Sequence, residues 1–484
     1  MMSPSVEPFN EVKYKALMDG LEASELNLSQ LERTKRIDSE FYKKENIAVD
    51  SILSLWNKNS IAECFYVSDG NHMGITDSFC ENGIPYYRGQ DIYHLFIENA
   101  EPLTIDQKTF DKPQMRRSHL KKGDVLMSIV GAIVGNSAIV TSSEPATCSC
   151  KLSIMRSKSH DILPELLLVY IKTKYGQVQI QKFKRGAAQT GLLLEDFDQL
   201  MIPVFGKDFQ EKVRQTVKAI YECTQRAAEA YNVAQNKLNG AIALNGTCQN
   251  QTAPSIKTLT ESFEMTGRLD AEYYLPYYQR CQIALRTNEN VGSLCKIHDE
   301  SFVPKEDEDY RYIELSNVGA VGEISGVNTM TGTELPSRAR RRVKKGQIVV
   351  SSIEGSLQSC ALITDDFDEC LCSTGFYILD SEQINPETLL VLFKSKVIQS
   401  LMKQRCSGTI LTGITKEEFL SMPLPKIEDD LQKEIAENIR HSFELRTQSK
   451  QLLEDAKCAV EMAIEQGEDI ALKWLESKMM PEEV

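Results

Sequence analysis

The 484-residue chain lacks the patterns that would assign it a chemistry. No segment approaches the roughly 20 apolar residues needed to cross a bilayer, so we expect a soluble, cytoplasmic protein with no membrane partner. A Gly-x-x-x-x-Gly-Lys-Ser/Thr loop is missing, which argues against NTP hydrolysis by this chain. A Gly-x-Ser-x-Gly elbow, a His-Glu-x-x-His pair and a Pro-Pro-Tyr/Phe run are missing as well. The sequence therefore favours a binding protein without catalytic residues.

Cysteine and histidine are not spaced for a metal or redox site. The 13 cysteines are scattered, and no two are separated by the two residues of a zinc knuckle or a redox motif. The pairs Cys148/Cys150 and Cys370/Cys372 could ligate a metal, but on a strand they would share one face, where small apolar residues are common. We expect reduced thiols and no metal.

Positive charge is scarce overall and concentrated locally. The formal net charge is −14, with 55 basic and 69 acidic residues. Much of the acid lies after residue 427, whereas Lys and Arg gather at 116–122, 182–185 and 338–345. Because affinity for nucleic acid is largely electrostatic, these runs are the candidate contacts.

The chain contains an internal repeat. Arg-Ile-Asp-Ser-Glu-Phe-Tyr at 36–42 recurs as Arg-Leu-Asp-Ala-Glu-Tyr-Tyr at 268–274, an offset of 232 residues. Three more pairs follow in the same order at offsets falling to 222, namely 120–128 with 343–351, 163–169 with 385–391, and 194–197 with 416–419. Two copies of one fold, with loops that differ between the copies, give this pattern.

The repeat predicts an α+β chain of two β-rich domains. The expected parts are an extension (1–35), domain 1 (36–206), helix 1 (207–245), a linker (246–267), domain 2 (268–426), helix 2 (427–468) and a tail (469–484). Short β-branched runs predict strands at 125–129, 138–140, 348–352 and 361–364. Pro followed by Glu predicts helices at 164–174 and 386–396.

The two long segments after the domains have coiled-coil spacing. In helix 1, apolar or small residues recur at strict 4-3 intervals, whereas the same register in helix 2 turns polar at Ser442, Arg446 and Ser449. Phe443, Leu445 and Leu452 form a second stripe for another partner. Antiparallel packing would relate the domains by a pseudo-two-fold axis. The residues predicted to pack helix on helix are Val213, Val217, Ile220, Ala227, Tyr231, Leu238, Ile435, Ile439, Leu453 and Val460.

The duplicated Arg-Ile/Leu-Asp-Ala/Ser-Glu-Tyr/Phe-Tyr opening, the Lys-Lys-Gly-Asp/Gln hairpin and the long helix after each domain resemble specificity subunits of type I restriction-modification systems. The resemblance extends from about 35 to 466. It implies two target-recognition domains that each read half of a bipartite site in double-stranded DNA, with the helices as a ruler. It also implies two methyltransferase subunits and restriction/translocase subunits as partners, with S-adenosylmethionine and ATP/Mg bound there rather than on this chain.

The resemblance places the Gly/Thr loops 184–191 and 406–413 near DNA, and the recurring basic runs are candidates for phosphate contacts. Without DNA contact, the Gly/Thr loops would be turns that close a strand, and the basic runs would be solvated surface. The predicted DNA-binding residues are Arg116, Arg117, Lys121, Lys122, Lys184, Arg185, Gln189, Thr190, Arg338, Arg340, Arg341, Arg342, Lys344, Lys345, Arg405, Thr409 and Thr412. Tyr86, Tyr87 and Arg88 are instead assigned to strand and core.

Two alternative functions stay open. The chain could be the recognition part of a fused methyltransferase-nuclease, although the repeats leave no room for a catalytic domain. It could also be a coiled-coil adaptor or scaffold without DNA specificity, which the acidic total favours and the recurring basic runs disfavour.

Overall fold

The computed structural model describes residues 9–34, 36–158, 161–186, 190–242, 255–264, 266–408 and 412–479. It is 49% helical and 18% strand. The chain divides into two compact units, unit 1 comprising 1–222 with 448–484, and unit 2 comprising 223–447. Each unit therefore contains one copy of the repeat and part of both long helices. In the described residues, no helix is both long and apolar enough to span a bilayer.

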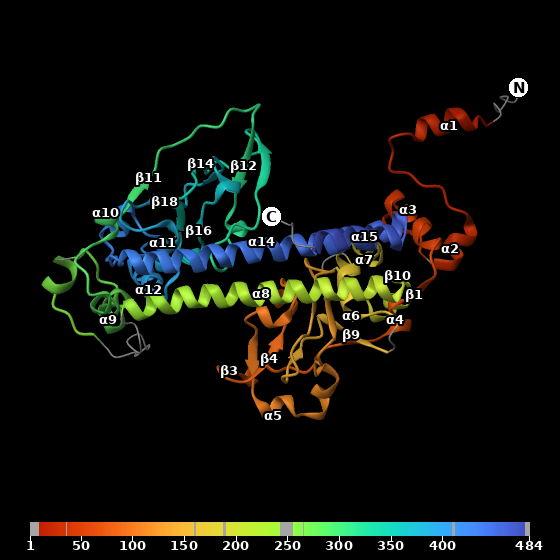
Figure 1. Cartoon of the computed structure of the whole chain (residues 1–484), viewed down its shortest axis with the longest axis horizontal. Coiled ribbons are helices and arrows are strands. Elements are labelled where there is room, and N and C mark those ends of the chain that lie inside the picture. Colours follow the sequence, from red (N-terminus) through yellow and green to blue (C-terminus); the bar gives the residue numbers. More distant parts are fainter. Residues whose placement is uncertain are drawn as a thin grey trace, which may run out of the picture. The chain divides into compact units, whose positions relative to one another are not determined.

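Unit 1 contains two four-stranded sheets (Figure 1). The first is antiparallel in the order β2 (Phe65–Asp69), β9 (Leu152–Ser157), β6 (Val125–Ser128) and β7 (Ser137–Ile139). The second has the order β3 (Phe79–Cys80), β5 (Leu103–Ile105), β4 (Ile84–Tyr87) and β8 (Thr147–Cys148), with β4 and β8 parallel. As predicted, Tyr86 and Tyr87 are buried strand residues.

Unit 2 repeats the antiparallel sheet and the parallel strand pair, while the order of its mixed sheet differs from that of unit 1. Its antiparallel sheet has the order β11 (Lys296–His298), β18 (Phe376–Asp380), β15 (Ile348–Ser351) and β16 (Cys360–Leu362). Its mixed sheet has the order β13 (Asn328–Thr331), β12 (Asp309–Ile313), β17 (Leu371–Ser373) and β14 (Ala339–Arg342), with β12 and β17 parallel. The parallel pair and the central antiparallel strands recur in both units, so the sequence repeat is a structural repeat. The predicted strands are confirmed as β6, β7, β15 and β16.

Helices pack on the antiparallel sheet of each unit. The predicted helices are confirmed as α6 (Pro164–Lys172) and α11 (Pro386–Lys394). Each ends where a second helix begins, α7 (Lys174–Phe183) or α12 (Lys396–Arg405). Thr173 and Ser395 are the N-caps of these second helices, and their hydroxyls accept from the backbone N–H of Gly176 and Ile398.

Shorter helices complete the two units. In unit 1 they are α1 (Glu11–Met18), α2 (Leu28–Thr34), α3 (Lys44–Ser54), α4 (Ile61–Cys64) and α5 (Gln107–Phe110), with a small sheet of β1 (Lys58–Ser60) and β10 (Met201–Pro203). In unit 2 they are α9 (Pro276–Leu285), α10 (Val291–Leu294) and α13 (Lys416–Ser421).

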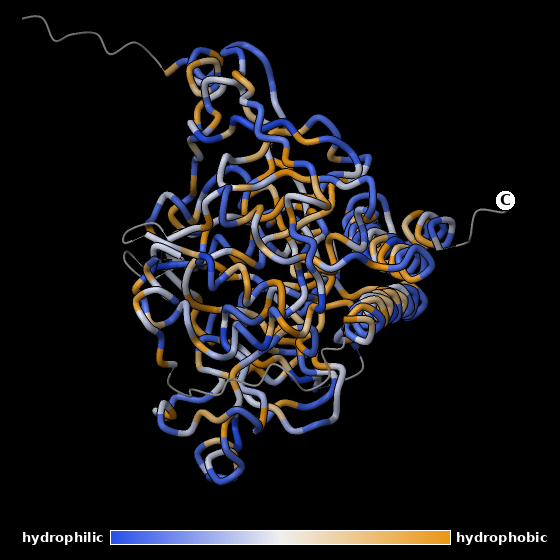
Figure 2. The backbone as a smooth tube through the Cα atoms, turned by 90° about the vertical axis from the view of Figure 1, so that its left-hand side faces the viewer, coloured by the Kyte–Doolittle hydropathy of each residue, from blue (hydrophilic) through white to orange (hydrophobic). Residues whose placement is uncertain are grey.

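The long helices α8 (Lys207–Ala241) and α14 (Asp429–Gln466) pack antiparallel within each unit. In unit 1 the start of α8 shares a core with the end of α14, and in unit 2 the end of α8 shares a core with the start of α14. All ten predicted packing residues are buried except Leu453, which is half-buried. Viewed nearly end-on in Figure 2, both helices alternate hydrophobic and hydrophilic residues around their circumference.

Two expectations about the C-terminal part need correction. The second stripe on α14 is covered, because Leu445 is 5% exposed and Phe443 and Leu452 pack against the cores. The segment given as a tail contains α15 (Glu468–Met479), whose Ala471 and Leu475 lie in the unit 1 core. Both corrections have one cause, the burial of apolar side chains by the chain itself.

Three of the four paired cysteines are core residues, whereas Cys150 lies in a turn after β8 and is half-buried, so the shared strand face predicted for Cys148 and Cys150 was wrong. Cys148 is fully buried in unit 1, and Cys370 and Cys372 are buried in one apolar cluster of unit 2, while Leu371 between them belongs to another. This is the alternation expected of a strand. In the residues described, no three metal-binding side chains come together.

Candidate nucleic-acid interface

The motif that opens each copy folds into a turn held by an Arg–Asp pair. Arg36 donates from Nε and Nη2 to the two carboxylate oxygens of Asp38 at 2.8 and 2.6 Å, and Arg268 does the same to Asp270 at 2.8 and 2.6 Å. The guanidinium hydrogen bonds lower the pKa of both carboxyls. The motif arginines are therefore structural in both copies.

Aromatic residues of the motif complete this turn. Tyr42 donates from its hydroxyl to the carbonyl of Arg36 at 3.1 Å, and Tyr274 donates to that of Arg268 at 2.9 Å. The Arg268 guanidinium also lies 4.4 Å from the ring centroid of Tyr273. Sequence reasoning did not find these contacts, although an Asp two residues after Arg in both copies was a visible signal.

The segment predicted to be a basic hairpin is not a pair of hydrogen-bonded strands. In copy 2 it joins β14 to β15, which lie in different sheets, and in copy 1 it joins the 3-10 helix Pro113–Ser118 to β6. We keep the name basic hairpin for this segment, residues 116–124 in copy 1 and 338–347 in copy 2.

In copy 1 hydrogen bonds fix the backbone of its turn. Asp124, 1% exposed, accepts from the backbone N–H of Lys121 at 2.8 Å and pairs with Arg156 at 2.6 Å. Gly123 has φ +88°, a conformation that favours glycine. Lys121 and Lys122 are exposed at this turn, and their ammonium groups have no partner in the described part of the chain.

The arginines just before this turn differ in their contacts. Arg116 lies in the 3-10 helix Pro113–Ser118 and is exposed, with no ion-pair partner among the described residues. Arg117 forms an ion pair with Asp69 of β2. Of these two arginines, Arg116 is the better candidate for a phosphate contact.

The basic hairpin of copy 2 has the same backbone. Gln347 stands where copy 1 has Asp124, and its side chain accepts from the backbone N–H of Lys344 at 2.8 Å. Gly346 has φ +81°. Lys344 and Arg338 are exposed, and no side chain in the described residues pairs with them. Exposed cations therefore recur at this hairpin.

The arginines of β14 have hydrogen-bond or ion-pair partners within the protein. Arg340 donates to the carbonyl of Ser337 at 3.1 Å, and Arg341 donates to that of Phe376 at 2.7 Å. Arg342 pairs with Glu369 at 3.1 Å and lies over an aromatic ring. Lys345 pairs with an aspartate at 2.6 Å. Since β14 is an edge strand, its charges also discourage strand addition by another chain.

The Gly/Thr loops are closed at their bases in the same way. Arg185 and Gly191 exchange backbone hydrogen bonds at 3.0 and 2.8 Å, as Ser407 and Gly413 do at 2.9 and 3.0 Å. The carbonyls of Thr190 and Thr412 accept from the backbone N–H groups of residues 131 and 354. The bases are thus turns that close a strand. The predicted contacts Gln189 and Thr409 lie outside the described residues.

Burial and ion pairing limit how many of the Lys and Arg side chains near these loops can contact DNA. Lys184 is half-buried and Arg185 forms an ion pair with buried Asp196. Arg405 needs a correction, because its side chain is in the interior, with the residue 6% exposed, and donates to the Leu401 carbonyl at 3.2 Å. Burial lowers the pKa of Arg405. It is part of the fold, so we remove it from the candidate contacts.

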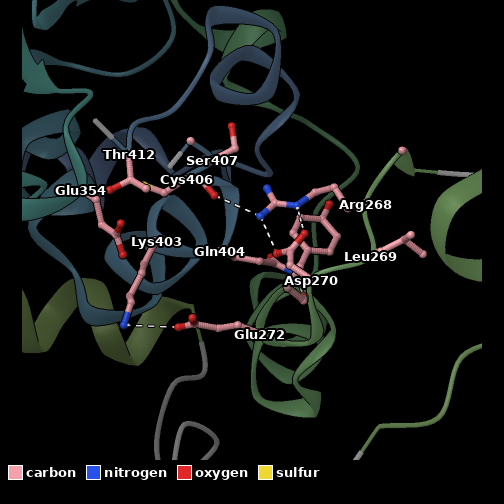
Figure 3. Close-up of a pocket in the computed structure, with 13 residues that line it drawn as sticks. Arg268, Leu269, Asp270, Glu272, Glu354, Lys403, Gln404, Cys406, Ser407 and Thr412 are labelled. Carbon is pink, nitrogen blue, oxygen red and sulfur yellow. Dashed lines mark hydrogen bonds and ion pairs between the residues drawn. The ribbon is translucent and has the colours of Figure 1, made fainter. Parts of the chain in front are cut away.

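A cavity lies between the opening motif and the Gly/Thr loop in each copy. Its volume is about 460 Å³ in unit 1 and about 400 Å³ in unit 2. Figure 3 shows the second cavity, with Arg268 reaching Asp270 and the carbonyl of Cys406, and Lys403 reaching Glu272. The motif and the loop, about 140 residues apart in sequence, are therefore neighbours in space.

Comparison with known proteins gives neighbours in structure only. No family model matches the chain, and no curated protein matches its sequence. A type I restriction-modification S subunit from M. genitalium is similar with 14% identity and a TM-score of 0.37, over 89% of this chain and 97% of that one. The HsdS subunit from Thermoanaerobacter tengcongensis has 14% identity and a TM-score of 0.27, over 87% and 96% of the two chains.

A third neighbour is the type IIG restriction endonuclease BpuSI, with 11% identity and a TM-score of 0.30 over 40% of this chain and 30% of that one. The first two neighbours are the kind of protein that the sequence motifs resemble.

Proposed function

We propose that this chain is the non-catalytic DNA-recognition subunit of a type I restriction-modification system. It would recognise a bipartite site in double-stranded DNA and direct two methyltransferase subunits and the restriction/translocase subunits to it. S-adenosylmethionine and ATP/Mg would be bound by those partners. The proposal depends on one observation, the recurrence of exposed, unpaired Lys and Arg at the same hairpin of two equivalent domains.

This recurrence is informative because the chain as a whole is acidic. At a net charge of −14, DNA contact requires cations that no carboxylate neutralises. Arg116, Lys121 and Lys122 in copy 1, and Arg338 and Lys344 in copy 2, meet this condition among the described residues. Two such hairpins on two domains fit a site with two halves. Bases would be read by other side chains, since phosphate contacts set affinity and register.

The test is a salt titration of DNA binding by the complex with its candidate methyltransferase subunit. Lys121→Gln/Lys122→Gln and Arg338→Gln/Lys344→Gln each remove two positive charges. If all four residues contact phosphates, each double variant lowers the slope of log K against log salt by about 1.8, at roughly 0.9 per contact. Lys473 and Lys396, one in each unit, are exposed and have no partner among the described residues. Their substitutions Lys473→Gln and Lys396→Gln are the controls and should leave the slope unchanged.

The same complex also tests the bipartite site. Mapping methylated adenines in DNA that the complex has modified should give two half-sites with a fixed gap, and the hairpin variants should keep the sequence while reducing the yield. An unchanged salt slope in both double variants would refute the hairpin assignment. A complex that neither binds nor methylates DNA would favour the scaffold hypothesis.

A further inference from the structure

A short loop of copy 1 presents a histidine to solvent beside the basic hairpin. His72 follows β2, and its side chain is 58% exposed. The ring nitrogen Nε2 of His72 lies 2.5 Å from a carboxylate oxygen of Asp69, the last residue of β2. The other carboxylate oxygen of Asp69 is paired with Arg117 of the basic hairpin. Asp69 thus joins the histidine to the segment that carries the exposed, unpaired Lys and Arg side chains of copy 1.

The loop that carries this histidine has a fixed backbone. A Cβ on Gly70 would clash with the carbonyl oxygens of Cys148 and Ser149, so the loop lies directly against this part of copy 1. Asn71 is 3% exposed and donates its backbone N–H to the carbonyl of Cys148 at 2.8 Å. Its side chain also exchanges hydrogen bonds with the backbone of Met73 at 2.8 and 2.9 Å. The exposed histidine therefore projects from a fixed support, which a group that reads a ligand by geometry requires.

The Asp69 carboxylate also determines which nitrogen of the imidazole ring carries the proton. A carboxylate ion accepts hydrogen bonds and donates none, so the Nε2 that faces it is protonated. In the neutral ring the second nitrogen, Nδ1, is then an acceptor. Arg117 balances the charge of the carboxylate, which reduces its repulsion of nearby phosphates. The arrangement leaves one oriented acceptor on an exposed ring.

This acceptor is complementary to one class of group on DNA bases. In the major groove, adenine N6 and cytosine N4 are amino groups that donate hydrogen bonds, whereas guanine O6 and thymine O4 only accept them. The Nδ1 atom of neutral His72 can bind an amino group, and it would face a keto oxygen without a hydrogen bond. Contacts of this kind specify sequence, while the neighbouring Lys and Arg side chains would contact phosphates.

Copy 2 has no histidine at the equivalent position. The pairing of β2 with β9, and of β11 with β18, aligns Asp69 with Asp299. Asp299 forms an ion pair with Lys416, and Phe302 stands three residues after it, where copy 1 has His72. The carboxylate is thus shared by both copies, while the residue beside it differs. A difference of this kind between two equivalent domains is what allows them to read different half-sites.

We propose that His72 reads one base of the half-site bound by copy 1, by accepting a hydrogen bond at Nδ1 from the exocyclic amino group of adenine or cytosine. Asp69 is a positioning residue, because it acts by holding the ring and setting its tautomer. The inference rests on the proposed function, since it requires that the basic hairpin of copy 1 contacts DNA.

The experiment maps methylated adenines in DNA modified by the full chain together with its candidate methyltransferase subunit. The wild-type motif should contain a half-site position with adenine or cytosine on one strand. His72→Ala should let this position accept guanine or thymine as well, with discrimination reduced about fivefold, as expected for one hydrogen bond. All other positions should stay the same. His441→Ala removes an exposed histidine of α14 and should leave the whole motif unchanged.

Asp69→Asn tests the positioning role. The asparagine oxygen can accept from Arg117 while its amide N–H donates to Nε2 of His72, which moves the proton of the neutral ring to Nδ1. Nδ1 then donates, so the preference at the same position should change to guanine or thymine. A merely structural role for Asp69 would lower methylation at all sites without reversing this preference. Melting temperatures equal to that of the wild type would show that the variants fold.

The outcomes separate this inference from the proposed function. An unchanged motif for His72→Ala, in a complex whose wild type methylates a bipartite site, would overturn the base contact and leave the proposed function intact. An equal loss of methylation at all sequences would also overturn it, because a phosphate contact gives that result. A wild-type complex that neither binds nor methylates DNA would refute the proposed function itself, and this inference with it.

Discussion

Two lysines at matched positions of the repeat should have opposite effects on stability. Lys172 is the last residue of α6, and Lys394 is the last residue of α11. Burial, together with repulsion from Lys457, lowers the pKa of Lys172 to about 8, and its ammonium has no hydrogen-bond partner in the described part of the chain. Burial lowers the pKa of Lys394 as well, but its ammonium donates to three carbonyls at 3.2, 2.9 and 2.7 Å, which offset the loss of water.

The magnitudes follow from these environments. A change in pKa from 10.5 to about 8 corresponds to an upper limit of roughly 3 kcal/mol at neutral pH, and partial exposure reduces it to ~1–2 kcal/mol. We expect Lys172→Met to stabilise unit 1 by that amount at pH 7. Lys394→Met removes hydrogen bonds from a charged donor, and should destabilise unit 2 by ~2 kcal/mol.

The pH dependence gives a second, independent measurement. Between pH 8 and 10.5 the unfolded chain holds the Lys172 proton more tightly than the folded chain, so this residue makes the free energy of unfolding rise with pH. The advantage of Lys172→Met should therefore be full below pH 8 and vanish by about pH 10.5.

Calorimetry of the two variants against the exposed control Lys396→Met would measure both effects, at roughly 2 °C per kcal/mol for units of this size. A lower melting temperature for Lys172→Met at pH 7, or an advantage that does not change with pH, would refute the reasoning. So would a Lys394→Met variant as stable as the wild type.

Other substitutions test the elements that position the candidate sites. Gly413→Ala would place a Cβ 2.8 Å from the carbonyl oxygen of Ser352, so we expect local opening of the loop base, seen as faster amide hydrogen exchange there. Ser442→Ala removes a buried 2.7 Å hydrogen bond to the carbonyl of Ala227 and should cost about 1 kcal/mol in a denaturant titration, with Ser442→Thr as the conservative control. Asp196→Asn weakens the ion pair at the Gly/Thr loop of copy 1, and a melting temperature at least 2 °C lower is expected.

The repeat and the apolar face along the long helices could be predicted from sequence because both are periodic. The 4-3 spacing in α8 specifies which face is apolar, and every predicted α8 packing residue is buried. The polar break in α14 also has a local reason, since Ser442 satisfies its hydroxyl on the facing helix.

Composition could not predict whether a given Lys or Arg side chain is buried, paired or free, because this depends on contacts distant in sequence. Arg405 had a usable signal, since it follows the buried Leu401 at helical spacing and lies on the apolar face of α12. Arg117 had none, because its partner Asp69 lies in β2, distant in sequence from the 3-10 helix that contains Arg117. A basic run therefore marks a candidate surface, but it does not show which of its side chains are free to make contacts.

This distinction decides which variants can test DNA recognition. The most arginine-rich part of the chain, Arg340 to Arg342, is the obvious target for charge reversal, yet each of these side chains has a partner within the protein. Arg341→Glu would lose the bond to the Phe376 carbonyl and place a carboxylate beside it, so weaker DNA binding would then report a damaged sheet. Arg338 and Lys344 have no such partner, so changes there alter the surface charge and leave the fold intact.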